Sequence, residues 1–448
     1  MLNAQFRGLY IVLLTSYILL ASCSIQQRIS KTAKQVINDS SLLTAHIGIS
    51  IYESASGKYW YNYQGDKYFV PASNTKIPTC YAAMKYLGDS LTCFLVGEND
   101  TLILIQPSGD PTFLHSDFKF QPAVEFLRNS KKKIYTTDIN WKSEALGSGW
   151  SWNDYNESYM AERSPAPIYG NVLKWIQEKE NGMESTIYSI PEINWPVNFN
   201  INEKAKTFAV KRKIGANEFE LIQGSEKYKE VYTPFVTHGI RSSIELLRDT
   251  IGKTIPLMTE DFGDKLYKKL ELNLYYIKTQ LTDSLLKPMM HRSDNFFAEQ
   301  SLLMVSNKRL GIMSDEKIID SLLQTDFKDL PQKPRWVDGS GLSRYNLFTP
   351  QDFVSILNKM KNEFGMERIK VILPTGGEGT ISNYYKVDSN YIFAKTGTLS
   401  GVVALSGYLY TKKGKLLIFS TLVNNHQASA TAVRRTLEKF IQGIRDRF

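Results

Sequence analysis

The pattern of hydrophobic and polar positions marks both ends of the chain as strands. Residues 45–52 and 59–63 alternate and are rich in β-branched and aromatic side chains, and a Ser-Ala-Ser-Gly turn separates them. This pattern predicts a β-hairpin. Near the other end of the chain, strand-like runs occur at 391–396, 402–410 and 415–422. We therefore expect the two ends of the chain to build one sheet.

Apolar positions at helical spacing occupy much of the intervening sequence. They run over 73–87, 240–251, 278–290 and 296–305, and over the amphipathic segment 430–445. This spacing predicts helices. We expect the helical middle of the chain to pack on a face of the sheet, with the helix that carries Ser73 beside the strand that carries Lys395.

The pattern changes between residues 92 and 233. Short strand-like runs alternate with turns there, and aromatic residues cluster between positions 141 and 159. We interpret residues 93–233 as a separate β-rich domain, inserted into a main domain made of residues 45–92 and 234–448.

The N-terminus has the pattern of an export signal. Arg7 precedes an apolar stretch over residues 9–20, and Leu-Ala-Ser-Cys ends it at Cys23. The stretch is too short to span a bilayer comfortably. The ending resembles a bacterial lipobox, so residues 1–22 are read as a lipoprotein signal peptide, Cys23 as the lipidated residue and 23–44 as a tether. A plain secretory signal with a chance cysteine is the alternative. Either way we expect an exported, periplasmic protein, and the lipobox reading anchors it to a membrane.

Composition narrows the function classes. The net charge of +9 favours anionic surroundings such as a cell wall or lipid headgroups, and a solvated basic surface is the simpler explanation. The one dense basic run, 131–133, lacks interleaved aromatic residues, so no nucleic-acid partner is expected. The five histidines are scattered without metal-ligand spacing, and neither a metal nor another cofactor is expected. Cys80 and Cys93 could form a disulfide bond or remain two buried thiols.

Three short motifs carry the chemistry. Ser73 and Lys76 fit S-x-x-K at the start of a predicted helix, residues 293–295 read Ser-Asp-Asn after another, and residues 395–397 read Lys-Thr-Gly on a predicted strand. S-x-x-K alone is a weak signal, because it recurs at Ser116/Lys119, Ser130/Lys133, Ser284/Lys287 and Ser314/Lys317. In this order and context the three motifs are the set typical of β-lactamases and penicillin-binding proteins.

The residue types indicate acyl transfer through a serine. The Ser73 hydroxyl needs a neighbouring base, and Lys76 can serve only as a neutral amine. Its pKa must therefore fall, through burial and through a nearby like charge. Lys395 is expected to supply that charge and to bind the terminal carboxylate of a peptide.

The remaining motif residues complete the predicted site. Ser293 can relay a proton from Lys76 to the leaving amine, and Asn295 can bind a substrate amide and hold Lys76. Backbone N–H groups of Ser73 and Thr398 are expected to stabilise the oxyanion. The hydroxyls of Thr396 and Thr398, on either side of Gly397, can bind the substrate carboxylate.

With these motifs, the chain resembles the low-molecular-mass class C penicillin-binding proteins of the D-alanyl-D-alanine carboxypeptidase/endopeptidase family. The resemblance covers nearly all of residues 40–448 and rests on the segments 71–76, 109–112, 293–299, 338–346, 373–380 and 395–399. The Asp-Gly-Ser-Gly-Leu-Ser-Arg stretch at 338–344 is the most specific. The resemblance implies an α/β (α+β) fold: a penicillin-binding, serine β-lactamase-like transpeptidase domain with an antiparallel sheet and a helical subdomain, interrupted by a β-rich insertion.

The resemblance also implies a substrate and a further site residue. It implies a serine D,D-peptidase that cleaves D-Ala-D-Ala ends or D-Ala cross-links of peptidoglycan stem peptides, with β-lactams as covalent inhibitors. An acidic residue of the inserted domain, here Asp154, would recognise the free end of the peptide's diamino acid. Residues 164–171 match the family only in part, which bears on substrate preference. A serine β-lactamase and an inactive peptidoglycan-binding scaffold are the alternatives, although no E-x-x-L-N follows the Ser-Asp-Asn motif and all the motif residues are intact.

Overall fold

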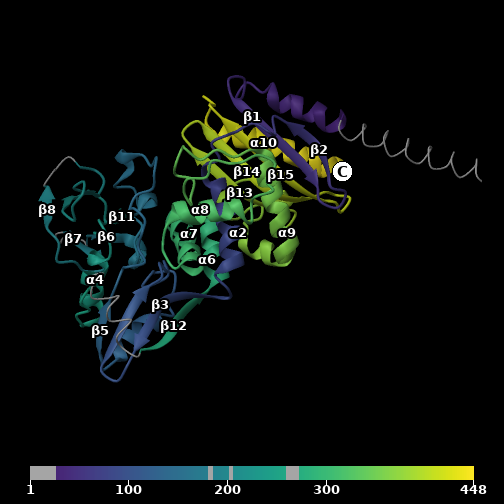
Figure 1. Cartoon of the computed structure of the whole chain (residues 1–448). Helices are drawn as coiled ribbons and strands as arrows, with labels where there is room; N and C mark the ends of the chain where they lie inside the picture. Colours follow the sequence, from purple (N-terminus) through teal and green to yellow (C-terminus); the bar gives the residue numbers. More distant parts are fainter. Residues whose placement is uncertain (1–26, 180–184, 201–204, 259–271) are drawn as a thin grey trace, which may run out of the picture.

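The computed structural model describes residues 27–179, 185–200, 205–258 and 272–448. The predicted signal peptide and Cys23 lie outside the described residues. Figure 1 shows the strands of the two chain ends and most of the helices together at the upper right, and the strands of the middle of the chain extending to the lower left. None of the helices in the described ranges is long and apolar enough to cross a membrane.

One antiparallel sheet joins the two ends of the chain, as the alternating pattern predicts. Its order is β13-β14-β15-β1-β2, with β15 pairing directly with β1. The five strands are β1 (His46–Glu53), β2 (Lys58–Tyr63), β13 (Ile392–Leu399), β14 (Val402–Tyr410) and β15 (Leu416–Asn424). This sheet places the Lys-Thr-Gly strand, β13, at one edge.

Helices cover both faces of the sheet. On one face, α10 (Ala430–Arg447) and a helix over residues 27–37 enclose a hydrophobic core. The core takes up Ile29, Ala33 and Val36, which recur at helical spacing, so this part of the predicted tether is packed rather than free. The other face carries α2 (Lys76–Tyr86), α6 (Thr282–His291), α7 (Asn295–Leu310), α8 (Asp315–Gln324) and α9 (Pro350–Ile372).

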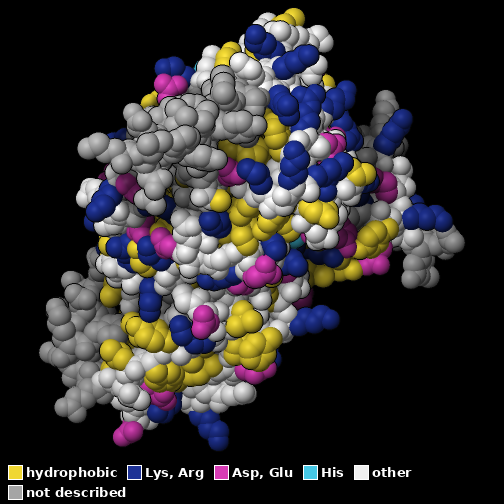
Figure 2. All heavy atoms as spheres, turned by 90° about the vertical axis from the view of Figure 1, so that its right-hand side faces the viewer, with side chains coloured by type: hydrophobic (Ala, Val, Ile, Leu, Met, Phe, Trp, Pro, Cys, Tyr) yellow, Lys and Arg dark blue, Asp and Glu magenta, His cyan; other side chains and the backbone are white. Residues whose placement is uncertain are grey.

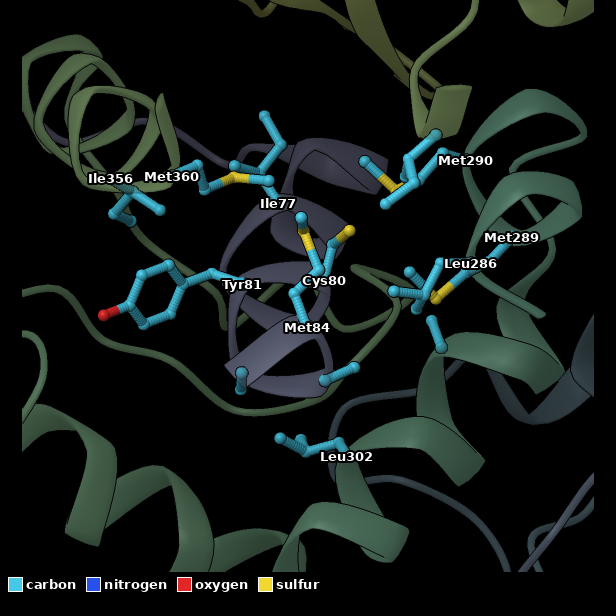
Figure 3. Packing of buried hydrophobic residues seen from close by; sticks show 14 of the residues in the cluster. Ile77, Cys80, Tyr81, Met84, Leu286, Met289, Met290, Leu302, Ile356 and Met360 are labelled. Carbon is cyan, nitrogen blue, oxygen red and sulfur yellow. The ribbon is translucent and has the colours of Figure 1, made fainter. Parts of the chain in front are cut away.

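The helix after Ser73 is the centre of that second core. Nine of the eleven residues of α2 are buried, so the helix has almost no polar face. Figure 3 shows Ile77, Cys80 and Met84 of α2 surrounded by side chains from α6, α7 and α9. Cys80 and Cys93 are both buried free thiols, which decides between the two alternatives for them. The central position of α2 holds Lys76 away from solvent.

The middle of the chain forms three further sheets around a third core. The first has the order β12-β3-β4-β5, the second β11-β6-β7 and the third β8-β10-β9. Their bounds are β3 (Ser90–Glu98), β4 (Leu102–Pro107), β5 (Lys133–Thr136), β6 (Val172–Glu178), β7 (Thr186–Ile190), β8 (Val197–Asn200), β9 (Ala209–Arg212), β10 (Phe219–Ile222), β11 (Tyr228–Pro234) and β12 (Asn273–Leu281), with α3 (Pro122–Asn129) and α4 (Arg241–Ile251) beside them. The middle of the chain is therefore β-rich.

The packing extends past the boundary predicted at residue 234. Leu246, Leu247 and Ile251 of α4 lie in the third core, and β12 pairs with β3 before α6 begins at Thr282. The observed helix α6 therefore begins at Thr282, four residues after the start predicted at position 278. The reason is that residues 273–281 complete the hydrogen bonds along one edge of β3, a long-range demand that local helical spacing does not report.

Basic side chains are spread over the surface. On the face drawn in Figure 2, Lys and Arg side chains cover much of the upper part, with acidic and hydrophobic side chains among them. This mixture fits a solvated basic surface better than a single continuous cationic patch.

Candidate active site

Ser73 lies on a short 3-10 helix, η1 (Ala72–Thr75), that leads into α2. Two glycines allow other segments to approach it. A Cβ on Gly397 would lie 2.5 Å from the carbonyl O of Pro71 and 3.1 Å from the backbone N of Ser73, and a Cβ on Gly341 would lie 1.9 Å from the carbonyl O of Ala72. Strand β13 and the loop before α9 can therefore contact the turn that carries Ser73 only because these positions have no side chain.

Lys76 points back to Ser73 from the first turn of α2. Its Nζ donates to Ser73 Oγ at 3.0 Å, to Asn295 Oδ1 at 2.6 Å and to the carbonyl O of Ser340 at 2.7 Å. The side chain is wholly buried. Burial lowers the pKa of Lys76 to about 8, although the negative charges of Asp338, Glu299 and Asp294 act to raise it. A substantial fraction of this lysine is thus neutral near neutral or slightly alkaline pH.

Lys395 is also wholly buried, on β13. Its Nζ donates to Ser293 Oγ at 2.8 Å and to the carbonyl O of Thr396 at 2.7 Å. Burial and then the charge of Lys76 lower its pKa well below the ordinary value. Burial is the main cause of the lowered pKa at both amines, and the repulsion between these two like charges acts in the same direction.

The Ser-Asp-Asn motif forms the corner between α6 and α7. Ser293 has a positive φ of 61° and faces Lys395, and Asp294 caps α7 by accepting from the N–H of Phe297. Asn295 accepts from Lys76 and donates from Nδ2 to the carbonyl O of Tyr159 at 3.0 Å. Ser293 is thus bonded to Lys395 rather than to Lys76, while Asn295 links Lys76 to the middle of the chain.

These residues open into a cleft of about 1020 Å³. Ser73, Ser293, Asn295, Thr396 and Thr398 all line it, whereas the Lys76 and Lys395 amines lie behind its wall. Another part of the wall comes from residues 149–160, including Trp150, Asp154 and Tyr159. Asp154 ends the short helix η2 (Trp152–Asp154), and its charge, after burial, raises the pKa of the neighbouring Tyr159 to about 12. The predicted residues of all three motifs and Asp154 therefore meet at one cleft.

Two arginines on the cleft wall were not anticipated from the sequence. Arg434, on α10, donates to Thr398 Oγ1, and Arg344 donates to the carbonyl O of Ser400 at 2.9 Å. Arg344 belongs to the specific segment 338–344, so its motif was visible. Arg434 lies in a helix whose amphipathic pattern carries no signal of a site, and only the packing of α10 against the sheet brings it to β13.

Comparison with known proteins agrees with this geometry. The family model described as the D-Ala-D-Ala carboxypeptidase 3 (S13) family matches residues 29–444. The D-alanyl-D-alanine carboxypeptidase DacB of Haemophilus influenzae is 24% identical over 411 residues, which cover 82% of each chain. The D-alanyl-D-alanine carboxypeptidase of Actinomadura sp. (strain R39) is 24% identical over 451 residues, covering 88% of this chain and 80% of that one.

A solved structure shares the fold. The crystal structure of penicillin binding protein 4 (dacB) from Haemophilus influenzae superposes with a TM-score of 0.71 at 20% identity, covering 93% of this chain and 98% of that one. The same protein complexed with a β-lactam gives a TM-score of 0.66 at 19% identity. The likeness establishes the penicillin-binding fold, with its antiparallel sheet and helical face.

Proposed function

The chain belongs to the D-Ala-D-Ala carboxypeptidase 3 (S13) family, and from this premise we propose how its cleft works as a serine-type D,D-peptidase on peptidoglycan. Ser73 is the nucleophile, and it attacks the carbonyl of the penultimate D-Ala of a stem peptide. The observation that carries this assignment is the 3.0 Å hydrogen bond between Lys76 and Ser73, made by an amine that is wholly buried.

Lys76 is the base that takes the proton of Ser73. A neutral amine has two N–H groups and one lone pair. The two N–H groups go to Asn295 Oδ1 and to the carbonyl O of Ser340, which lie 2.6 and 2.7 Å away. The lone pair is then left facing the Ser73 hydroxyl, which donates to it. The pKa of about 8 keeps part of the lysine in this neutral form.

The oxyanion and the leaving group are handled at the edge of β13. The backbone N–H groups of Ser73 and Thr398 stabilise the oxyanion, and the contact of Gly397 with Pro71 and Ser73 supports their closeness. Ser293 lines the cleft and hydrogen-bonds to Lys395, so its hydroxyl can pass a proton to the leaving amine. Water then hydrolyses the acyl-enzyme.

The substrate carboxylate is bound by Thr396, Thr398 and Arg434. The Lys395 ammonium, expected from the sequence in this role, is buried and donates to Ser293 and to the Thr396 carbonyl. The Arg434 guanidinium lines the cleft and reaches Thr398 Oγ1 from the side. A guanidinium matches a carboxylate in shape and charge.

Asp154 recognises the free end of the diamino acid in the stem peptide. Its place on the wall of the same cleft as Thr396 and Thr398, next to Tyr159, supports this role, because a substrate that fills the cleft would pass it. A carboxylate there suits a free ammonium group.

The protein acts outside the cytoplasm, tethered through lipidated Cys23. The apolar stretch before Leu-Ala-Ser-Cys supports this proposal. Mass spectrometry of the mature N-terminus checks it, and a diacylated or triacylated Cys23 is expected. An unmodified N-terminus at another position would instead indicate a plain secretory signal.

Labelling with a fluorescent penicillin tests the nucleophile. The Ser73→Ala variant should lose all covalent label, because among the described residues the Ser73 hydroxyl alone is bonded to Lys76. The matched control is Ser130→Ala, which removes the serine of another S-x-x-K match outside the cleft and should label like the parent. Persistent label on Ser73→Ala would contradict the assignment.

A digest of purified peptidoglycan fragments tests the reaction itself. Release of D-Ala from pentapeptides, or loss of cross-linked dimers, is expected with the parent and not with Ser73→Ala. Unchanged fragments would mean an inactive scaffold. Rapid multiple turnover of a chromogenic cephalosporin, in place of a single stoichiometric burst, would mean a β-lactamase.

A further inference from the structure

The segment 338–343, Asp-Gly-Ser-Gly-Leu-Ser, belongs to the most specific motif in the chain, and the roles of its side chains are not explained by the chemistry above. It is a loop between α8 and α9, and the carbonyl O of Ser340 accepts from Lys76 Nζ at 2.7 Å. The loop lies between two other parts of the site. A Cβ on Gly339 would lie 2.8 Å from the carbonyl O of Ala298 in α7, and Gly341, with a φ of +86°, lies against Ala72 in η1.

Asp338 holds the loop from inside. Its side chain is wholly buried and accepts from the N–H of Gly341 at 2.8 Å and from the N–H of Ser343 at 2.7 Å. The Gly341 N–H and the Ser340 carbonyl belong to one peptide group. A carboxylate at the N–H end of that group polarises the carbonyl at its other end, which strengthens it as an acceptor for Lys76.

Trp150 connects Asp338 to the cleft. The indole Nε1 donates to the second carboxylate oxygen of Asp338 at 3.0 Å, and Asn346 Nδ2 donates to the first at 2.7 Å. Trp150 lines the part of the cleft formed by residues 149–160, four residues before Asp154. The wall expected to meet the diamino acid is thereby tied to the loop that contacts Lys76.

Glu299 holds the same loop from α7. Its Oε1 accepts from the N–H of Ser340 at 2.7 Å, and Arg163 lies 3.4 Å from its Oε2. Glu299 is four residues after Asn295, so the two side chains lie one turn apart on the same face of the helix. One face of α7 therefore contacts Lys76 directly through Asn295 and indirectly through Glu299 and Ser340.

We propose that Asp338 and Glu299 are positioning residues for Lys76, because together they fix the Ser340 carbonyl that orients the amine toward Ser73. The proposal rests on the proposed function, in which Lys76 is the base. Without the Ser340 acceptor, Lys76 could rotate about its bond to Asn295 and direct its lone pair away from the Ser73 hydroxyl.

The same two carboxylates set the charge around Lys76. Asp338, Glu299 and Asp294 face it from the loop, from α7 and from the cap of α7, and each raises its pKa, whereas Lys395 faces it from β13. Arg163 in turn faces Glu299. Removing the negative charge of Asp338 or Glu299 should lower the pKa of Lys76, so the rising limb of the rate against pH should move to lower pH.

The test measures the second-order rate of acylation by a fluorescent penicillin across pH 5–10 for the full chain (pH range chosen around the pKa of about 8 at Lys76). Asp338→Asn should slow acylation about tenfold or more at the optimum and move the limb down by about one pH unit. Glu299→Gln keeps an oxygen acceptor for the Ser340 N–H and should move the limb in the same direction by less. If Asp338→Asn does not fold, the pH at which the acylation rate of Glu299→Gln rises still tests the proposal.

Asp352→Asn is the matched control. Asp352 is an equally buried carboxylate that accepts backbone N–H groups, but it caps α9 and is not among the charges that shift Lys76. It should lower the melting temperature and leave the limb in place. A limb at the parental pH in both Asp338→Asn and Glu299→Gln would overturn the proposal. Failure of the parent itself to be acylated would instead overturn the proposed function.

Discussion

The two walls of the cleft are built on opposite principles. On the wall formed by η1, α2, α7 and β13, Lys76 and Lys395 are wholly buried, and their amines have hydrogen-bond partners at 2.6–3.0 Å. The wall formed by residues 149–160 is open: Ser151, Asn153 and Tyr159 line the cleft and are exposed, Tyr159 to 46%. Proton transfer needs amines held out of water at fixed distances, whereas recognition of a large polymer needs groups that a passing chain can reach.

This difference has an energetic consequence. Burial of an amine disfavours its charged form, so the buried wall produces a neutral lysine at a pH where a surface lysine is charged. Exposed groups bind through solvent-screened contacts. We therefore expect substitutions on the buried wall to change rate and pH dependence, and substitutions on the open wall to change substrate preference by smaller factors.

The largest effect is expected for Lys76→Met. This change keeps much of the side-chain volume and removes the amine, so acylation by penicillin should fall about 10²–10⁴-fold. The measurement is the acylation rate from stopped-flow or gel fluorescence. Lys133→Met, the lysine of another S-x-x-K match at an exposed position, is the control and should acylate normally. A parental rate for Lys76→Met would mean that the buried wall holds a different base.

The pH profile of the parent sharpens the same point. Lys76 must be neutral to accept a proton, and its pKa is about 8. The acylation rate should therefore rise with pH, change fastest near pH 8 and level off above it, losing nearly tenfold for each pH unit below the limb. A rate that is flat between pH 6 and 9 would show that a group with a lower pKa takes the proton.

A moderate effect is expected for Arg434→Gln, at the border between the two walls. Loss of the guanidinium should raise the KM for a peptide ending in D-Ala-D-Ala about tenfold, with less change in kcat, because a charge-assisted contact is removed. The same peptide with a C-terminal amide has no carboxylate and should be cleaved equally by both proteins. An equal loss for acid and amide would show that Arg434 supports β13 without contacting substrate.

The smallest effect is expected for Asp154→Asn on the open wall. A partly exposed charge pair contributes little, so the KM for a stem peptide with a free ammonium on its diamino acid should rise about fivefold. Acetylating that ammonium should remove the difference between variant and parent, and acylation by penicillin should be unaffected. A large loss of penicillin acylation would mean that the two walls are not separable in function.

Much of the buried wall was predictable because its signals are local. Ser73 and Lys76 are one helical turn apart, the Ser-Asp-Asn motif caps a helix, and Lys-Thr-Gly lies in a strand-like run near the end of the chain. The pairing of the chain ends into one sheet also followed from pattern.

The boundary of the middle region shows why other features escaped prediction. Residues 278–281 are predicted to begin a helix, yet they belong to β12, which pairs with β3 more than 170 residues earlier in the chain. A segment becomes a strand at the edge of a distant sheet because the partner strand offers unpaired backbone N–H and C=O groups. Neither the partner nor its register is encoded in the spacing of nearby residues.

Residue type and short-range spacing thus identify the nucleophile, the base and the chemical class, because a helix turn or a strand brings those groups into register without help from elsewhere. The acceptor that orients Lys76 lies 264 residues away on a loop, and Arg434 comes to Thr398 from the last helix. Those contacts exist only after the sheet closes and the helices pack on both its faces. They join residues that are far apart in the chain, and the periodic pattern of hydrophobic and polar residues does not report which distant segments will pack together.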